Sequence, residues 1–425
     1  MSALSAERQS FWTGSGAWSP PPAIHGAMHT TQFGVRVHGP RDSASSFDIL
    51  VSSFLCRSAA KSVSFFPRID YRTNEQNNPA VIIYFTETEP EGAEFFANSL
   101  PDHDVRFASR LGDVGPDAEI LSCFIYSKID SAFLAAHPSL KLVTTRSTSV
   151  EHIDAAACHA RGVVVCSAPF FGDATVAEHT FALMLALSRR LREVMLSPKN
   201  GRFSYEATRG FELAGKTLGI IGMGRIGQRV AELASAFQMR VVAYDVRQSA
   251  STTGNLTCDF VTLDHLLASS HVISLHASLT AETYHILNAE TLAKCQRGVL
   301  VVNTARGSLL DTHALREALN SGQVGGAGLD VLQDERVMRE SASRIIADDI
   351  VQHLRSDAMA TDERDADRIR ELQELMLSDD VLSRSNVVFT PHVAFNSLEA
   401  TERMRRATLE NISGFVAGRP ANVSA

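Results

Sequence analysis

The stretch from Thr217 to Asp245 constrains the fold of this chain more than any other part of the sequence. An apolar run, Thr217–Ile221, leads directly into three spaced glycines, and apolar residues then recur at helical spacing. A second strand-like run, Arg240–Tyr244, ends in Asp245. Strand, glycine loop, helix, strand and terminal acid in this order are typical of a βαβ unit that binds a dinucleotide.

Each glycine has a physical role in such a loop. Gly222 permits the tight turn out of the strand, Gly224 has no side chain to keep a pyrophosphate from the backbone, and Gly227 lets the helix pack closely on the sheet. The helix begins at Arg225 and Ile226, where unpaired N–H groups and the positive end of the helix dipole favour phosphates. We expect these five residues to bind the cofactor. The alternative, a glycine-rich turn without a ligand, accounts for the turn but not for the strand, helix and acid around it.

Asp245 bears on which dinucleotide is bound. It lies eighteen residues after Gly227 and is placed to accept hydrogen bonds from an adenosine ribose. A carboxylate there repels a 2′-phosphate, and the next residue, Val246, is not an arginine that could receive one. Arg247, two residues beyond Asp245, could receive a 2′-phosphate and so makes the preference for NAD less strict. The sequence predicts NAD rather than NADP.

Glycines or ionisable residues follow six successive predicted strand ends. The predicted strands end at Ile221, Tyr244, Leu275, Asn303, Leu329 and Thr390. In an open parallel sheet, ligands bind beyond the carboxyl ends of the strands. We therefore expect one site lined by the residues that follow these ends: Gly222, Gly224, Asp245, His276, Thr304–Gly307, Asp330, Glu335 and Pro391–His392. Among them, the residues predicted to lie at the cofactor include His276, Thr304 and Asp330.

Three of these residues suit chemistry on a carboxylic acid. The planar guanidinium of Arg306 can hold a carboxylate through two hydrogen bonds. His392 can give or take a proton near neutral pH, and a carboxylate such as Glu335 stabilises the charged form of a neighbouring histidine. Each also has an ordinary explanation: a surface ion pair for the arginine, a solvated side chain for the glutamate, and a core histidine for His392. Together they predict hydride transfer at a carbon next to a carboxylate.

Composition limits the other classes. A chain of 425 residues is long enough for two or three domains, and a net charge of −8 argues against a nucleic-acid-binding surface. No apolar run reaches the length of a membrane span. The six cysteines show no CxxC pair and no metal-type spacing, which indicates buried free thiols, a reducing compartment and no bound metal. We expect a cytoplasmic protein with neither nucleic acid nor membrane as a partner.

The chain divides into an unusual N-terminal region and a regular remainder. Residues 1–78 are rich in Ser and Arg and poor in acids, so they could be a disordered extension, an organelle-targeting segment or a stretch upstream of the true start. Strand and helix patterns then alternate through two α/β units, and one long helix from Ala174 to about Met195 joins them. Residues 337–384 interrupt the pattern as a polar insertion. Ser397–Gly418 is predicted to be a helix that returns to the first unit.

Together these motifs resemble the D-2-hydroxyacid dehydrogenase family over about residues 80–420. The likeness rests on the glycine loop and on four further stretches: Thr175–His179, Asn303–Ser308, Gly328–Val331 and Thr390–Phe395. The resemblance implies that Arg306 binds the substrate carboxylate and carbonyl, that His392 is the acid/base and that Glu335 is its partner. It also implies that Asp330 supports the site near the nicotinamide.

Within the family, the sequence is most similar to the D-lactate dehydrogenase subgroup. Phe124–Asp130, Thr145–Thr148 and Pro391–Ser397 carry this likeness. It implies a substrate pocket that includes Tyr126, Ser147, Thr148, Ser149, Phe171 and Phe395, in which backbone N–H groups at 147–149 receive the carboxylate. Three features depart from the pattern: Ser149 replaces a common glycine, Phe171 replaces a common tyrosine, and the insertion has no counterpart of its size.

The family likeness implies two doubly wound, Rossmann-like α/β domains with a cleft between them. Residues 79–172 and 394–425 would form the flavodoxin-like substrate domain, and residues 173–393 would bind NAD. The implied function is reduction of pyruvate, or a similar small 2-keto acid, to the D-2-hydroxy acid with NADH, in a homodimer. Alternatives are a larger 2-keto acid, another substrate such as phosphite, or an NAD(H)-sensing corepressor-like role. The insertion could cover the cleft, alter subunit contacts or do neither.

Overall fold

The structure is a computed structural model that describes residues 80–196, 208–246, 258–333 and 376–424. The N-terminal region, Glu335 and most of the polar insertion lie outside these residues. Residues 376–383, at the end of the insertion, are helical. Leu377 and Val381 of this segment are buried, so the end of the insertion, which its composition predicts to be polar, packs into the protein.

The first sheet contains five parallel strands in the order β2-β1-β3-β4-β5, the flavodoxin-like order. The three strands at the centre of this order are mostly apolar and are almost wholly buried. The strands are β1 (Ile82–Thr86), β2 (Asp104–Ala108), β3 (Ile120–Cys123), β4 (Leu142–Thr145) and β5 (Val164–Cys166). A single-turn 3-10 helix, Leu111–Asp113, precedes β3.

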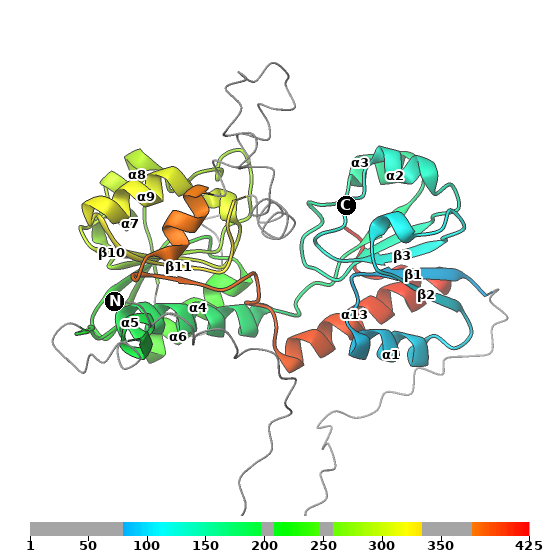
Figure 1. The fold of residues 1–425 in the computed structure, drawn as a ribbon, viewed down its shortest axis with the longest axis horizontal. Helices are drawn as coiled ribbons and strands as arrows, with labels where there is room; N and C mark the ends of the chain where they lie inside the picture. The colour runs from blue at the N-terminus through cyan, green and yellow to red at the C-terminus, as the bar shows by residue number, and fades with distance from the viewer. Residues whose placement is uncertain (1–79, 197–207, 247–257, 334–375, 425) are drawn as a thin grey trace, which may run out of the picture. The chain divides into compact units, whose positions relative to one another are not determined.

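Helices cover both faces of this sheet (Figure 1). On one face, α1 (Pro90–Ser99) and the C-terminal α13 (Leu398–Val416) pack through Phe96, Leu409 and Ile412 against β1 and β4. On the other, α2 (Ser131–Ala136) and α3 (Ala155–Ala160) contribute Leu134 and Cys158. The prediction that the C-terminal helix returns to the first unit is confirmed.

The second sheet contains seven parallel strands in the order β12-β11-β10-β9-β6-β7-β8. In chain order this is 7-6-5-4-1-2-3, the Rossmann order with one strand added, so the doubly wound prediction is confirmed. The strands are β6 (Thr217–Ile221), β7 (Arg240–Tyr244), β8 (Asp259–Phe260), β9 (Val272–Leu275), β10 (Val299–Asn303), β11 (Val324–Leu329) and β12 (Val387–Phe389). Five predicted strand ends agree, β12 ends one residue early, and the two-residue edge strand β8 was not predicted.

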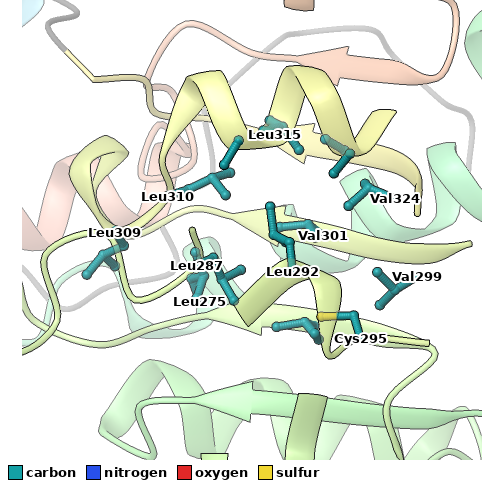
Figure 2. Packing of buried hydrophobic residues seen from close by; sticks show 14 of the residues in the cluster. Leu275, Leu287, Leu292, Cys295, Val299, Val301, Leu309, Leu310, Leu315 and Val324 are labelled. Atoms are coloured by element: carbon teal, nitrogen blue, oxygen red, sulfur yellow. The ribbon is translucent and has the colours of Figure 1, made fainter. Parts of the chain in front are cut away.

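Each face of the second sheet has its own core. α7 (Leu263–Ser269), α8 (Ala289–Ala293) and α9 (Thr312–Ser321) cover one face, and α4 (Asp173–Ser188) and α6 (Arg225–Ala236) cover the other (Figure 1). Figure 2 shows the first core, where Leu292 of α8 and Leu315 of α9 pack over Val299 and Val301 of β10. Cys295 is buried here as a free thiol.

The single helix predicted from Ala174 to Met195 is wrong, because the chain breaks after α4. Arg190 takes a positive φ of 50°, and α5 (Leu191–Leu196) follows as a separate helix. The Ser188 carbonyl, which would continue the helix ladder, instead accepts the Phe211 N–H at 2.9 Å. The segment around Gly210 and Phe211, which lies against the Ser188 carbonyl, therefore ends α4. No helix in the described parts of the chain is long and apolar enough to cross a membrane.

Candidate active site

The glycine loop lies at the point where the strand order of the second sheet reverses. β6 and β9 are neighbours there, and the helices that follow them lie on opposite faces. Gly222 has a φ of 96°, and a Cβ on it would lie 2.4 Å from the Ala277 nitrogen. A Cβ on Gly227 would lie 2.2 Å from the Gly222 carbonyl oxygen. A Cβ on Gly224, at the N-cap of α6, meets only open space. The loop thus has the shape that a pyrophosphate at a helix N-terminus requires.

Two alanine substitutions should separate binding from folding in this loop. Gly224→Ala is expected to raise the KM for NADH about tenfold without lowering the melting temperature, because the methyl group fills space that the pyrophosphate needs. Gly227→Ala is expected to cost about 1–3 kcal/mol or more of unfolding free energy, because its methyl group meets backbone. Calorimetry and NADH titration check both. Equal destabilisation by the two variants would contradict the assignment of Gly224.

Asp245 and Arg225 lie beside this loop. One Asp245 carboxylate oxygen accepts the Met223 N–H at 2.7 Å, which joins the end of β7 to the loop. The Arg225 guanidinium donates two hydrogen bonds to Asp173, at 2.7 and 3.0 Å, and its central carbon lies 3.8 Å from the ring centre of Phe170. Ile226 is partly buried against the core of α4 and α6. The side chains of Arg225 and Ile226 therefore both have contacts within the protein.

His276 follows β9, and its N–H donates to Ile221 beside the glycine loop. Its Nε2 lies 2.8 Å from the Ser274 hydroxyl. Burial lowers the pKa of His276 to about 3, so the ring is neutral at physiological pH. A neutral imidazole next to the phosphate loop contributes shape and one hydrogen bond rather than positive charge.

The lowered pKa of the partly buried His276 should make the protein sensitive to mild acid. The unfolded chain binds a proton near pH 6.5 and the folded chain only near pH 3, so stability falls as the pH drops through this window. From pH 6.5 to pH 5 this amounts to about 2 kcal/mol of unfolding free energy. Urea unfolding at pH 7 and pH 5 measures it. His276→Asn should lose that part of the difference, and an unchanged difference would show that His276 is not the cause.

Asp330 holds the loop that carries His392. Its carboxylate is 1% exposed and accepts hydrogen bonds from the Thr390 hydroxyl at 2.5 Å and from the N–H groups of Val393 and Ala394 at 3.0 and 2.9 Å. The His392 N–H donates to the Asp330 carbonyl at 2.8 Å. His392 has a φ of 55°, a left-handed conformation that costs about 1–3 kcal/mol in a residue other than glycine. These bonds to Asp330 hold it there.

Arg306 lies on a turn that is closed by hydrogen bonds of the Asn303 side chain. The Asn303 amide donates to the Arg306 carbonyl at 2.8 Å and accepts the Ala305 N–H at 3.0 Å. The guanidinium donates to the Ala305 carbonyl at 2.7 Å and, through Nε, to Glu151 at 3.0 Å. The Thr304 hydroxyl lies 2.9 Å from that of Thr180 on α4. Arg306 is thus paired with a carboxylate of the protein itself. A 3-10 turn, Gly307–Leu309, follows.

The loop after β4 is held by its own side chains. The Ser147 hydroxyl donates to the Ser149 carbonyl at 2.6 Å and lies 2.9 Å from the Thr145 hydroxyl, which His152 contacts at 3.0 Å. Thr148 donates to the Ala168 carbonyl at 3.4 Å. Within the described chain, no hydrogen-bond acceptor is found for the backbone N–H groups at 147–149. An anion is the kind of ligand that such a run of N–H groups binds.

Aromatic rings gather around Phe395. Its ring centre lies 5.5 Å from that of Phe124, 6.3 Å from that of Phe171 and 6.4 Å from that of His392. Phe124 also packs edge-on against Tyr126, at 5.6 Å. Four of the predicted site residues, Tyr126, Phe171, His392 and Phe395, therefore belong to one chain of ring contacts.

Sequence reasoning missed several partners of these residues. His179 and Thr180 on α4 contact the loops of His392 and Arg306, and Glu151 pairs with Arg306. The available signal was the polar run Glu178–Thr180 in the middle of a helix that is mostly apolar after it. The predicted partner of His392, Glu335, lies outside the described residues.

The fold, glycine loop and buried loop supports define a dinucleotide-binding α/β protein with a polar site at its strand ends. Comparison with known proteins is consistent with this class. Residues 181–394 match the family described as D-isomer specific 2-hydroxyacid dehydrogenase, NAD binding domain. The chain belongs to this family. It is accordingly an NAD-dependent oxidoreductase that acts on the CH–OH group of 2-hydroxyacids.

Individual relatives differ in what they are named for. A hydroxypyruvate reductase of Thermotoga maritima is 35% identical over 297 residues, which is 70% of this chain and 84% of that protein. A D-lactate dehydrogenase of Escherichia coli is 32% identical over 281 residues, 66% of this chain and 77% of the relative. Among solved structures, D-lactate dehydrogenase from Aquifex aeolicus, complexed with NAD and lactic acid, superposes with a TM-score of 0.67 at 33% identity, covering 79% of this chain and 96% of that one.

Proposed function

We propose that the protein is a D-lactate dehydrogenase, which reduces pyruvate or a similarly small 2-keto acid to the D-2-hydroxy acid. The observation that carries the proposal is the apolar wall beside His392. Phe124, Phe171 and Phe395 offer rings and no polar atom, so they suit a methyl or short alkyl group on the substrate.

Different residues of the chain bind the substrate, transfer the proton and hold the cofactor. The guanidinium of Arg306 and the N–H groups at 147–149 hold the substrate carboxylate. His392 donates a proton to the keto oxygen during reduction and takes it back during oxidation, with Glu335 as its carboxylate partner. Gly222–Gly227 and Asp245 would hold NAD(H), which would supply or accept the hydride. Asp330 fixes the backbone of His392 so that its ring stays beside Phe395.

The apolar wall should discriminate against hydroxylated substrates. The 3-hydroxyl of hydroxypyruvate would be buried against Phe171, where a tyrosine hydroxyl is absent. An unsatisfied buried hydroxyl costs about 1–3 kcal/mol, or about 5- to 150-fold in kcat/KM. Pyruvate is therefore the expected substrate, although a hydroxypyruvate reductase is among the relatives.

The test follows NADH oxidation by absorbance with pyruvate, hydroxypyruvate and a branched 2-keto acid offered in parallel. Rapid oxidation with pyruvate, giving D-lactate by chiral chromatography, is the expected result. A higher kcat/KM for hydroxypyruvate would replace the substrate but keep the family chemistry. NADH binding with no turnover of any keto acid would favour an NAD(H)-sensing regulator instead.

We also propose the domain division and a homodimer. Residues 79–172 with 394–425 would hold the substrate and residues 173–393 the cofactor, a boundary supported by the family match over 181–394. Exposed apolar side chains of the second unit, including Leu191, Met195 and Phe211, support a subunit contact. Sedimentation equilibrium at micromolar concentration would distinguish monomer from dimer.

A further inference from the structure

Two consecutive residues of α4 reach two different loops of the candidate site. His179 Nε2 lies 2.9 Å from the Thr390 hydroxyl, on the loop of His392. The Thr180 hydroxyl lies 2.9 Å from that of Thr304, on the loop of Arg306. α4 packs on β10 and β11, so one helical turn contacts the segments that carry both groups assigned to the chemistry. Neither residue contacts the glycine loop through a described hydrogen bond.

The direction of the first contact follows from its neighbours. The Thr390 hydroxyl donates to Asp330 at 2.5 Å, so its oxygen must accept from His179. His179 therefore carries its proton on Nε2, and the chain of donors runs from His179 through Thr390 to the buried Asp330 carboxylate. That carboxylate also receives the N–H groups of Val393 and Ala394, on the far side of His392. His179 Nε2 itself lies 3.5 Å from Asp330 Oδ1.

The second contact has the opposite direction. Thr180 donates its hydroxyl proton to the Val176 carbonyl, at 2.8 Å within α4. Its oxygen therefore accepts from the Thr304 hydroxyl, and both side chains are buried. Thr304 and Arg306 share a turn closed by Asn303, so this hydrogen bond fixes the base from which the guanidinium extends.

We propose that His179 and Thr180 are positioning residues that set the two groups separately: His179 places His392 for proton transfer, and Thr180 places Arg306 for carboxylate binding. The proposal rests on the proposed function. His179 acts through the hydrogen bond that it donates, because the oxygen it meets belongs to a hydroxyl that has already given its proton to Asp330. The left-handed backbone of His392 makes its loop the one that most needs such support.

The two residues should give different kinetic signatures. His179→Leu is expected to lower kcat about tenfold with little change in either KM, because an imperfectly placed acid affects the chemical step. Thr180→Val is expected to raise the KM for the keto acid about fivefold with a smaller effect on kcat, because Arg306 binds the ground state too. A general structural defect would instead move all parameters and the KM for NADH together.

Conservative variants at the same two positions should recover the kcat and the KM that the first substitutions change. His179→Gln keeps an N–H donor at nearly the position of Nε2 and should recover most of the kcat that His179→Leu loses. Thr180→Ser keeps the acceptor and should restore the KM. His265, an exposed histidine of α7, is the matched control, and His265→Leu should behave as wild type. Equal kinetics for His179→Leu and wild type, or failure of His179→Gln to recover kcat, would overturn the role of His179. Failure of Thr180→Ser to restore the KM would overturn that of Thr180.

Hydrogen exchange tests the proposal without relying on turnover. Measured by mass spectrometry on the full chain, exchange of the backbone amides in 390–397 should quicken in His179→Leu and not in His179→Gln. Exchange in 303–309 should quicken in Thr180→Val alone. Wild-type protein that turns over no keto acid would refute the proposed function, yet this measurement would still decide the positioning roles. Unchanged exchange in both segments would refute those roles in a fully active enzyme.

Discussion

Replacing His392 by glutamine is expected to lower kcat for pyruvate reduction about a thousandfold or more, with NADH binding unchanged. General acid catalysis by a positioned side chain contributes about 10²- to 10⁴-fold, and glutamine cannot donate a proton to the reduced substrate oxygen. Glutamine does keep the size of the side chain and a hydrogen-bond donor. The Asp330 bonds that fix the loop come from backbone groups and Thr390, so they survive the substitution.

Three measurements check this result. Single-turnover absorbance separates the chemical step from binding, NADH fluorescence gives the Kd of the cofactor, and calorimetry reports folding. His285 is a suitable control because it is also a histidine with a positive φ, of 50°. His285→Gln should retain kcat within about twofold, whereas loss of activity in both variants would point to backbone strain. If His392→Gln turned over at nearly the wild-type rate, the acid/base would have to be another residue.

Most of the fold could be predicted from local patterns. Five strands of the second sheet end where apolar runs stop, because a parallel strand buried on both faces must be apolar throughout. The break between α4 and α5 could not be predicted in this way. It depends on the Phe211 N–H reaching the Ser188 carbonyl from a segment more than twenty residues away, and no local period carries that information. The edge strand β8 has only two residues and leaves no period to detect.

The site residues also divide into those that local motifs predict and those that only tertiary contacts identify. Gly222, Gly227 and Asp330 were predicted from motif and position, and their close backbone contacts and buried hydrogen bonds explain why those residue types stand there. Arg225 was predicted to lie at the cofactor because it begins the helix after the glycine loop, and its side chain pairs with Asp173. The role of His179 could not be assigned, because a histidine in a helix looks the same in the sequence whether its side chain packs in the core or supports a loop. Only the tertiary contact with Thr390 distinguishes the two.

Arg306 offers the second large effect. Arg306→Gln is expected to lower kcat/KM for pyruvate about a hundredfold, because each hydrogen bond between a charged donor and a carboxylate is worth about 1.5–3 kcal/mol. Arg306→Lys keeps the charge but not the planar fork, so it should recover only part of the loss. NADH binding should not change, since the described hydrogen bonds of Arg306 reach Glu151 and Ala305 rather than the glycine loop.

The contact between Glu151 and Arg306 leads to a second prediction about binding of the substrate carboxylate. Glu151 accepts a hydrogen bond from Arg306 Nε at 3.0 Å, so a substrate carboxylate must use the remaining donors of the guanidinium or displace Glu151. Glu151 is about half exposed, so its own pairing is weak and easily given up. Glu151→Gln should therefore lower the KM for pyruvate by less than about fivefold, the reverse of the effect of Arg306→Gln. Binding of oxamate, a carboxylate isostere of pyruvate, to the NADH-loaded enzyme measures both without turnover. Unchanged oxamate affinity in Arg306→Gln would mean that the N–H groups at 147–149 hold the carboxylate without the arginine.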